Sequence, residues 1–296
     1  MEAKNNYINM ENKIEYIATL LEKCSKHKFE QYVISRLWHM LDDDRIKIVT
    51  QQCIYIDKEK GERALADIYL PQVNIVIEVD EVHHLKKKEE DALREQGIID
   101  SIGAEIHRIN CTAKTDEDIN AQLDKVVDII KIKVSEKEKL NLFLPWDLEM
   151  EQTADYHKRK EYLSVIEGDY VKNTTEAFKI FDINFQQRSM AKIPGFNNLS
   201  VWCPYEDGPE WKNTLSNYGT ILLEEYKGDK EGKCSKEPNG ALEKRIVFLK
   251  GKNILGQPAA RFIGIFKFDK MDNKSAVWRR FSYFCDMRNL FLYDNY

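Results

Sequence analysis

Acidic side chains interrupt one of the most apolar stretches of the sequence. Residues 66–84 read ADIYLPQVNIVIEVDEVHH, and their isoleucine, leucine and valine content is typical of a strand inside a sheet. Asp67 lies near the start of this stretch, Glu78 and Asp80 lie near its end, and His83 and His84 close it. An ionised carboxylate in such surroundings is unfavourable unless a positive charge or hydrogen-bond donors meet it. The acidic positions therefore need a chemical explanation.

The carboxylates have the spacing of a metal site. Alternate residues of a strand share a face, so Glu78 and Asp80 are expected to point to one side, and Asp67 on the adjoining strand to reach the same edge. Three carboxylates at one point repel one another unless a divalent cation lies between them. Oxygen ligands favour Mg²⁺, with Mn²⁺ as a substitute, and the cation would activate water against a phosphodiester. We predict that all three bind the metal and act in catalysis; the alternative is a turn cap and a solvated edge strand.

Two histidines and further polar residues extend the predicted site. A histidine beside metal-bound water is a suitable general base near neutral pH, so His83 and His84 are predicted to be catalytic, one as the base and the other as an orienting residue or phosphate contact. Glu30, on a predicted helix, is a candidate outer residue of the site, although a solvated position would also explain it. One of Gln51 and Gln52 is expected to point inward, and Gln52 is taken as the second outer candidate.

The first half of the chain is predicted to be a mixed α/β domain that positions these residues. Apolar residues at helical spacing indicate helices, and β-branched runs between turn residues indicate strands, in the order ααβββαβα. The predicted elements are two helices within 14–40, strands at 45–56, 63–70 and 74–80, a helix at 86–102, a strand at 105–110 and a helix at 116–134. A charged run at 135–141 and Pro145 indicate a linker or domain edge, so residues 1–140 are predicted as one domain.

The remaining residues, 141–296, are predicted to form a β-rich domain with one or two helices near its start. This half holds four of the five tryptophans, and strand-like runs such as TILLEEY, KRIVFLKG and RFIGIFKFD alternate with glycine and proline turns. The fold class predicted for the whole chain is therefore α+β or α/β, with a mixed sheet flanked by helices followed by a second, β-rich domain.

Composition limits the class of protein. A hydrophobic content of 43% with 32% charged residues is typical of a globular protein, and no apolar stretch is long enough to span a bilayer. The N-terminal residues lack the apolar core of a signal peptide, and six cysteines occur without a C-x-x-C pair, so we expect reduced thiols, a cytoplasmic location and no contact with a membrane. The net charge of −5 argues weakly against nucleic acid as a partner, but basic runs near the C-terminus could form a local phosphate-binding face.

The αβββαβ order with Asp67 and Glu78 resembles the PD-(D/E)xK nuclease superfamily. Asp80 stands where that superfamily usually has lysine, and the histidines that follow resemble its very-short-patch-repair-type branch. The segments QQC at 51–53, ALADIYLPQ, IEVDEVHH, WKN and VWRR are similar to PvuRts-type modification-dependent restriction endonucleases, over nearly the whole chain. The resemblance implies an N-terminal nuclease joined to a C-terminal SRA-like domain. That domain would flip and read 5-hydroxymethylcytosine, or its glucosylated form, in double-stranded DNA that is cut at a distance.

The second half contains residue types that suit a pocket for a flipped base. Such a pocket needs an aromatic plane for stacking and polar groups for the edge of the base. One stretch offers Trp202, Tyr205, Trp211, Asn213 and Glu224, of which all but Tyr205 match, by resemblance, the positions that the family uses. A carboxylate can accept from the cytosine N4 amino group, and the Asn213 amide could bond the hydroxymethyl oxygen or O2. The alternative places the tryptophans in a core and Glu224 in solvent.

Basic residues near the C-terminus are candidate phosphate contacts, although solvation would explain any one of them. They are Lys244, Arg245, Lys250, Arg279 and Arg280. One catalytic centre cuts one strand, so a double-strand break predicts a homodimer. Two other functions remain open at this point: a nicking DNA-repair endonuclease, and a modified-cytosine-binding module without nuclease activity.

Overall fold

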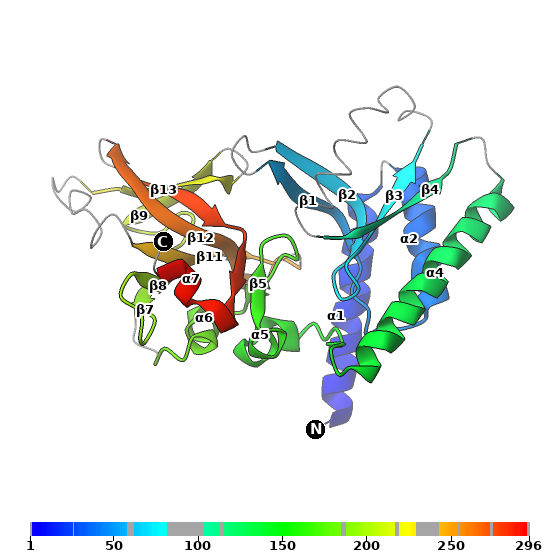
Figure 1. Cartoon of the computed structure of the whole chain (residues 1–296), viewed down its shortest axis with the longest axis horizontal. Coiled ribbons are helices and arrows are strands. Elements are labelled where there is room, and N and C mark those ends of the chain that lie inside the picture. Colours follow the sequence, from blue (N-terminus) through cyan, green and yellow to red (C-terminus); the bar gives the residue numbers. More distant parts are fainter. Residues whose placement is uncertain are drawn as a thin grey trace. The chain divides into compact units, whose positions relative to one another are not determined.

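The chain divides into two compact units, Met1–Asp147 and Leu148–Tyr296 (Figure 1). The structure is a computed structural model, and it describes residues 2–25, 27–57, 62–81, 103–112, 115–184, 188–216, 219–228, 243–253, 255–272 and 275–294. The helix predicted at 86–102 and the His83–His84 pair lie outside these ranges. Within them, no helix is long and apolar enough to cross a membrane.

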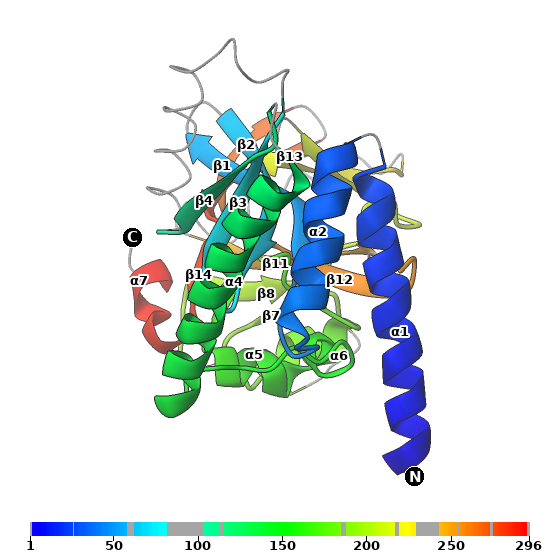
Figure 2. The same cartoon turned by 90° about the vertical axis from the view of Figure 1, so that its right-hand side faces the viewer.

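The first unit is a mixed sheet with helices packed on it. Its described strands are β1 (Val49–Asp57), β2 (Glu62–Leu70), β3 (Ile75–Asp80) and β4 (Glu105–Asn110), and its helices are α1 (Glu2–Lys23), α2 (Lys28–Leu41) and α4 (Asp116–Lys139). The sheet order is β1-β2-β3-β4, antiparallel except for the parallel pair β3–β4. Helices α2 and α4 lie over one face of the sheet (Figures 1 and 2). The element order predicted for the described part of this unit is therefore confirmed.

Apolar packing fixes which face of β2 and β3 carries the acidic residues. Ile68, Ile77 and Val79 belong to the core that the two strands share with α2 and α4. Side chains alternate between the faces of a strand, and a slip of one residue would move this apolar set out of the core. Asp67 and Glu78 are consequently held on the face opposite this core.

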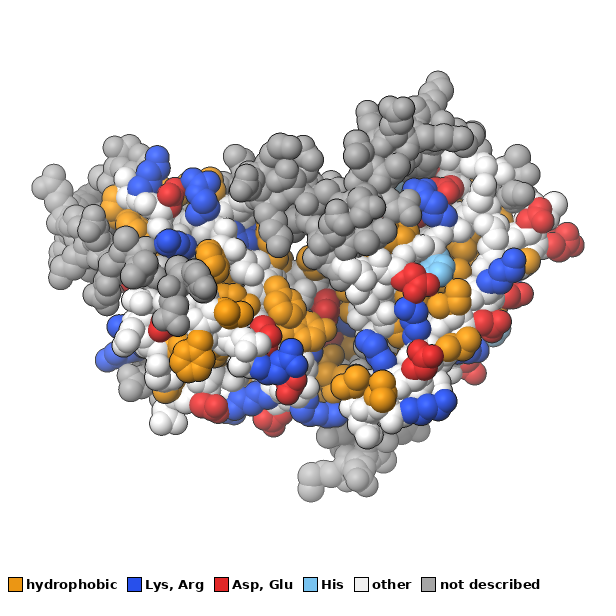
Figure 3. Space-filling view, in the orientation of Figure 1, with side chains coloured by type: hydrophobic (Ala, Val, Ile, Leu, Met, Phe, Trp, Pro, Cys, Tyr) orange, Lys and Arg blue, Asp and Glu red, His pale blue; other side chains and the backbone are white. Residues whose placement is uncertain are grey.

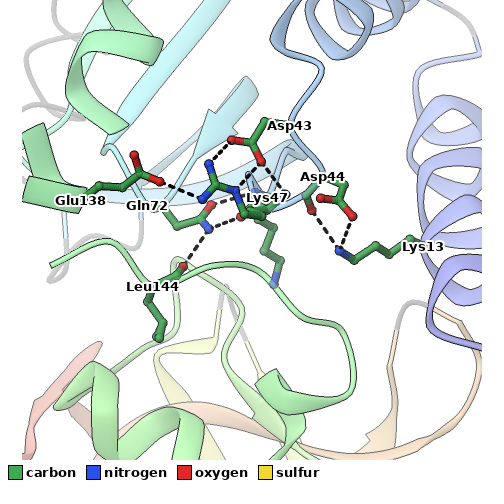
Figure 4. A network of polar contacts seen from close by, with 8 residues as sticks. Lys13, Asp43, Asp44, Lys47, Gln72, Glu138 and Leu144 are labelled. Carbon is green, nitrogen blue, oxygen red and sulfur yellow. Dashed lines mark hydrogen bonds and ion pairs between the residues drawn. The ribbon is translucent and has the colours of Figure 1, made fainter. Parts of the chain in front are cut away.

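A polar network anchors the hairpin that joins β2 to β3. Gln72, in the turn, accepts a hydrogen bond from the Lys47 backbone N–H at 2.7 Å and donates to the carbonyl oxygens of Arg45 at 2.7 Å and Leu144 at 2.9 Å (Figure 4). The Arg45 guanidinium in turn contacts Glu138 of α4 at 2.8 Å. One turn residue thereby ties the acidic hairpin to the segment between α2 and β1 and to the segment after α4.

Helix α4 is longer than predicted. The Thr115 hydroxyl accepts a hydrogen bond from the Asp118 N–H, and the Asp118 carboxylate accepts one from the Thr115 N–H, so a capping box begins the helix. The helix then continues to Lys139, through the run predicted as a linker or domain edge. Glutamate and lysine are good helix formers, so this charged run favours a helix over a linker.

The second unit contains an eight-stranded sheet in the order β7-β8-β11-β12-β13-β10-β9, with β6 paired to β12. The strands of this sheet are β6 (Tyr170–Val171), β7 (Met190–Lys192), β8 (Leu199–Trp202), β9 (Trp211–Ser216), β10 (Ile221–Tyr226), β11 (Lys244–Lys252), β12 (Pro258–Asp272) and β13 (Ser275–Ser282). A second sheet pairs β5 (Tyr162–Ser164) with β14 (Phe284–Asp286), and the α-helices are α5 (Ala154–Lys160), α6 (Thr174–Ile180) and α7 (Phe291–Asp294). The predicted β-rich character is confirmed.

Strand β11 separates two apolar clusters on opposite faces of the large sheet. Ile246 and Phe248 pack in a core that includes residues of α6, whereas Val247 and Leu249 pack with Trp202 and Trp278. The pairing of β11 with β12 shifts register beside Gly264, whose φ is +115° and where an added Cβ would lie 2.6 Å from the Ser282 carbonyl oxygen. Only glycine fits this position, because both the backbone angle and the close approach exclude a side chain.

A buried ion pair joins the segments around β5 and β6. The Lys160 ammonium lies 2.7 Å from both carboxylate oxygens of Asp169, which also accepts the Ser164 N–H at 2.6 Å. Burial opposes ionisation of Asp169, but the Lys160 charge and the Ser164 hydrogen bond hold the pKa of this carboxyl below its usual range. Breaking a buried pair of this kind by removing one partner costs about 3–5 kcal/mol.

Candidate functional site

Asp67 and Glu78 face each other across the β2–β3 hairpin. Ile68 pairs with Ile77, and continuing this antiparallel register by one residue places Asp67 opposite Glu78. The Asp67 Oδ2 accepts a hydrogen bond from the Val79 N–H at 2.8 Å, which holds its side chain against β3. Glu78 is 5% exposed. The hairpin therefore brings two of the predicted carboxylates together.

Glu30 approaches this pair from the first turn of α2. His27, which precedes the helix, makes no side-chain cap, and Glu81 accepts the Phe29 N–H at 3.3 Å instead. Because Glu81 follows β3 directly, this contact brings the first turn of α2 to the acidic end of that strand. The Glu30 side chain is buried, with its Oε1 3.1 Å from the His27 Nδ1.

A residue of β1 with a left-handed backbone conformation supplies the next partner of Glu30. Thr50 pairs with Ile68 and Gln52 with Ala66, so the register sets Gln51 opposite Asp67, and the φ of Gln51 is +51°. The Gln51 Nε2 donates to the Glu30 Oε2 at 2.7 Å. The prediction that one of the two glutamines points inward thus applies to Gln51, which contacts Glu30, instead of the chosen Gln52.

Negative charges interact across this group. Burial and the nearby Asp67 carboxylate raise the pKa of Glu30, against the opposing effect of His27 and the Gln51 hydrogen bond. Burial and the Glu30 carboxylate also raise the pKa of the Cys24 thiol to about 11, so this cysteine is protonated at neutral pH. Glu30 and Asp67 are consequently close enough for the ionisation of one to affect the other. This proximity places the predicted outer residue Glu30 at the site.

Asp80 belongs to a different contact. Its Oδ1 lies 2.7 Å from the Arg108 guanidinium of β4, and both side chains are about one-third exposed. In the described ranges, no group of three His, Cys, Asp or Glu side chains lies close enough to hold a metal ion. The predicted convergence of three carboxylates is therefore not found, because Arg108 neutralises Asp80 where a shared cation was expected.

The two remaining carboxylates suit Mg²⁺. This cation commonly takes one or two protein carboxylates and completes its octahedron with water and substrate phosphate. Asp67 and Glu78 supply hard oxygen donors from facing strand positions, and the Cys24 thiol, which interacts with Glu30, is protonated. The donor set consequently fits a magnesium ion held on one side by protein and on the other by substrate.

All five predicted base-binding residues line one pocket of the second unit. The pocket has a volume of about 300 Å³. Its lining residues are Ser189, Trp202, Pro204, Tyr205, Gly208, Pro209, Glu210, Trp211, Asn213 and Glu224. The pairing of β9 with β10 sets Asn213 directly opposite Glu224, which explains how residues eleven positions apart reach the same cavity.

Asn213 has a free acceptor in this pocket. Its side chain is 2% exposed, and its Nδ2 donates to the Tyr205 carbonyl oxygen at 2.8 Å. Its Oδ1 is buried without a hydrogen-bond partner in the described structure. A buried polar atom of this kind is costly unless a ligand or water bonds to it. Asn213 therefore both holds the Tyr205 wall and offers an acceptor to a ligand.

The aromatic residues of the pocket differ in accessibility. Trp202 is buried, with its ring centroid 6.0 Å from that of Trp278, so it contributes more to the apolar floor than to a free stacking surface. Trp211 is partly exposed and packs on Tyr226, and Tyr205 is 56% exposed with the Lys250 ammonium 4.4 Å from its ring centroid. Trp211 and Tyr205 are thus the aromatic planes that a ligand can reach.

Two of the predicted phosphate contacts are buried. The Lys244 side chain is inaccessible and donates to the Tyr293 carbonyl oxygen at 2.7 Å. Arg245 is 6% exposed and contacts Glu224 and Glu243. Both predictions are wrong, because these side chains lie within the sheet; Arg279, by contrast, is largely exposed. On the face that Figure 3 shows, basic and acidic side chains are interspersed over the described surface of each unit.

Arg108, Gln51 and Trp278 are contact residues that the sequence interpretation did not select. Arg108 pairs in register with Glu78. The sequence signal that could have indicated this contact was a charged residue inside the short predicted strand EIHRIN. Trp278 donates its indole N–H to Glu224 at 3.0 Å. A tryptophan in a predicted strand does not by itself indicate such a contact. The contact of Gln51 with Glu30 depends on the positive φ of Gln51, which side-chain patterns do not reveal.

A carboxylate-bearing mixed sheet followed by a β-rich domain with an aromatic pocket is the arrangement of a restriction endonuclease with a separate base-reading domain. Residues 14–143 match the family described as restriction endonuclease PvuRts1 I-like, N-terminal, and residues 156–287 match the SET and RING associated (SRA) domain. The chain therefore has the architecture of PvuRts-type restriction endonucleases, a nuclease domain followed by an SRA domain.

A solved structure supports this assignment. The chain is similar to AbaSI, a protein described as a 5-hydroxymethylcytosine-specific restriction enzyme, with 28% identity and a TM-score of 0.59. The match covers 87% of this chain and 92% of the AbaSI chain, so it includes both domains. A search of curated protein sequences gives no match.

The geometry separates the expected roles of Glu30 and Asp80. Replacing Glu30→Gln removes a charge that acts on Asp67, and we expect it to slow DNA cleavage by about 10- to 100-fold, as for residues that support a metal ligand. Asp80→Asn breaks only a partly exposed ion pair, worth up to about 1 kcal/mol, so we expect less than about a five-fold change. Single-turnover cleavage rates with Mg²⁺ measure both. Equal losses of cleavage rate in the two variants would show that Asp80 takes part in catalysis.

Proposed function

We propose that this chain is a Mg²⁺-dependent endonuclease that cuts double-stranded DNA at a distance from 5-hydroxymethylcytosine or its glucosylated form. The observation that carries the proposal is the pocket in the SRA domain, where two reachable aromatic rings, an unpaired amide oxygen and a fixed carboxylate meet in about 300 Å³. The similarity to AbaSI, whose described specificity is for 5-hydroxymethylcytosine, supports the choice of modified base. The restriction-endonuclease family that residues 14–143 match supports the choice of reaction.

In the first unit, Asp67 and Glu78 would hold the cation on the face of the hairpin opposite the core. Bound there, Mg²⁺ would stabilise charge on the phosphate and lower the pKa of the attacking water. Glu30 adds negative charge next to Asp67, and Gln51 keeps the Glu30 carboxylate in one orientation. The general base is proposed to be His83 or His84, which the described ranges do not include.

In the second unit, the modified cytosine leaves the helix and enters the pocket. Trp211 and Tyr205 offer surfaces on which the base can stack, and the Asn213 Oδ1 accepts from the hydroxymethyl group or another donor of the ligand. The Glu224 carboxylate accepts from the N4 amino group of cytosine. Extruding a base costs a few kcal/mol, which these contacts offset only when the pocket is filled correctly.

Cleavage of matched duplexes tests the proposal. We expect wild-type protein with Mg²⁺ to cut DNA containing 5-hydroxymethylcytosine or its glucosylated form, and to leave plain cytosine duplexes intact. Asp67→Ala and Glu78→Ala are expected to abolish cutting, because each removes a cation ligand, while leaving modified-DNA affinity close to wild type. The controls are reactions in EDTA and binding measured in Ca²⁺. Modified-DNA binding without cutting by wild type would indicate a reading module, and cutting of a single strand would indicate a nicking enzyme.

The pocket residues are expected to differ in what their loss changes. Trp211→Ala removes a stacking surface worth roughly 1–3 kcal/mol, so affinity for modified DNA should fall about ten-fold or more. Asn213→Ala removes the free acceptor and should mainly reduce the preference for modified over plain cytosine. Anisotropy titrations at fixed salt, with plain, methylated, hydroxymethylated and glucosylated duplexes, measure both effects. Phosphate contacts should preserve non-specific binding in both variants. If both variants kept the wild-type affinities and the wild-type order of preference among the four duplexes, the modified base would have to bind outside this pocket.

One predicted centre per chain implies that two copies make a double-strand break. We propose a homodimer that cuts best between two modified cytosines on opposite strands. A duplex with two such sites should be cut at least about ten-fold faster than one with a single site, because the second copy then binds at high effective concentration. Cleavage kinetics combined with sedimentation of the protein–DNA complex measure this. A monomer that breaks one-site and two-site duplexes equally fast would disprove it.

A further inference from the structure

Arg245 lies behind the wall of the base pocket and is not part of its lining. Its guanidinium is 3.8 Å from the ring centroid of Trp278 and 4.7 Å from that of Trp202, so two tryptophans enclose it. Its side chain is 8% exposed. A buried guanidinium needs negative partners, because removing it from water would otherwise be too costly. Two glutamates provide them.

The two glutamates hold different parts of the same guanidinium. The Nε of Arg245 donates to Glu243 at 2.9 Å, and its NH1 donates to the Oε2 of Glu224 at 3.3 Å. Arg245 lies at the start of β11 and Glu243 just before that strand, whereas Glu224 lies on β10, on the other side of β12 and β13 in the sheet order. Arg245 therefore spans the sheet and fastens a residue of the pocket to a distant strand.

The Glu224 carboxylate receives two donors on a single oxygen. In addition to Arg245, the indole N–H of Trp278 donates to the same Oε2 at 3.0 Å. Rotating the carboxylate would break both hydrogen bonds together. Trp278 itself is fully buried, and the Arg245 guanidinium stacks on its ring. Arg245 therefore fixes the indole N–H donor as well as supplying the positive charge next to Glu224. The orientation of Glu224 is consequently set before any base enters.

We propose that Arg245 is a positioning residue that fixes Glu224 and thereby makes the pocket select a cytosine-type base. A 4-amino group donates to a fixed carboxylate, whereas the 4-carbonyl of a uracil-type base would set two acceptors against each other. The inference rests on the proposed function, since it concerns how that pocket tells two bases with the same 5-hydroxymethyl group apart. A carboxylate free to turn could avoid the repulsion, so discrimination depends on the guanidinium as well as on Glu224.

The test compares duplexes that differ only at the base edge. Fluorescence anisotropy with the full-length protein at fixed salt gives dissociation constants for one 5-hydroxymethylcytosine and for one 5-hydroxymethyluracil. A base-edge contact of this kind carries discrimination of about 5- to 150-fold. In Arg245→Met we expect the ratio of the two constants to fall by about ten-fold or more. Arg245→Lys keeps the charge but loses the planar fork, so it should restore part of the ratio.

A double variant separates positioning from simple structural support. Glu224→Gln should lose the same discrimination, and adding Arg245→Met to it should cause no further loss of the ratio, since the arginine acts through that carboxylate. Arg279→Met is the matched control: it removes an exposed cation of the same domain and should weaken all duplexes equally, with the ratio unchanged. Additive losses in the double variant would overturn the inference.

The outcomes for this inference and for the proposed function are distinct. If wild-type protein shows no preference for 5-hydroxymethylcytosine over plain cytosine, the proposed function fails. If that preference is present and Arg245→Met retains the wild-type ratio of 5-hydroxymethylcytosine to 5-hydroxymethyluracil, only the positioning role fails. Should Arg245→Met not fold, as judged by its circular dichroism, Arg245→Lys carries the same comparison, and a wild-type ratio in that variant overturns the role.

Discussion

The cost of taking a charge out of water determines how both functional regions of this chain are built. Each places carboxylates in an apolar sheet, where an ionised group is stable only if another group compensates its charge or fills its hydrogen bonds. Among the described residues of the first unit, the compensation of the Glu30 charge by His27 and Gln51 is opposed by the nearby Asp67 carboxylate. In the second unit the compensation is complete for the oxygen of Glu224 that faces Arg245 and Trp278.

That difference matches two kinds of chemistry. In the proposed reaction, a cation and a phosphate have to enter the first region, so protein groups that neutralised it permanently would compete with them. In the same proposal, the base that enters the second region is neutral and is distinguished by the direction of its hydrogen bonds, which favours a carboxylate fixed in advance. Asn213 follows the same logic, because its donor is bound to the Tyr205 wall while its acceptor stays available.

Some of this arrangement could be predicted from the sequence, and each contact that could not be predicted has its own physical reason. The apolar alternation around Asp67 and Glu78 fixed their common face, and the clustering of aromatic and polar residues at 202–224 indicated the pocket. The ion pair of Asp80 with Arg108 was not predicted, because Arg108 comes from a strand that pairs in parallel after a long connection.

The misassigned basic residues have a different cause. Lys244 and Arg245 were predicted to be phosphate contacts at the surface. Each is buried and bonded to a partner about 20 to 50 positions away in the sequence. Likewise, the contact of Gln51 with Glu30 depends on a left-handed backbone residue inside a strand. Long-range strand order and local backbone irregularity are properties of the assembled sheet, and side-chain periodicity does not encode either one.

The division of the chain into two units has a thermodynamic consequence. The core under the first sheet contains only residues of the first unit, and the two apolar clusters of the second sheet contain only residues of the second. Each unit is therefore expected to melt as a cooperative body of its own, so a calorimetric trace should need two transitions instead of a single two-state enthalpy. A destabilising mutation in the core of the first unit would lower the melting temperature of that unit alone. The second unit would stay folded and still able to bind DNA.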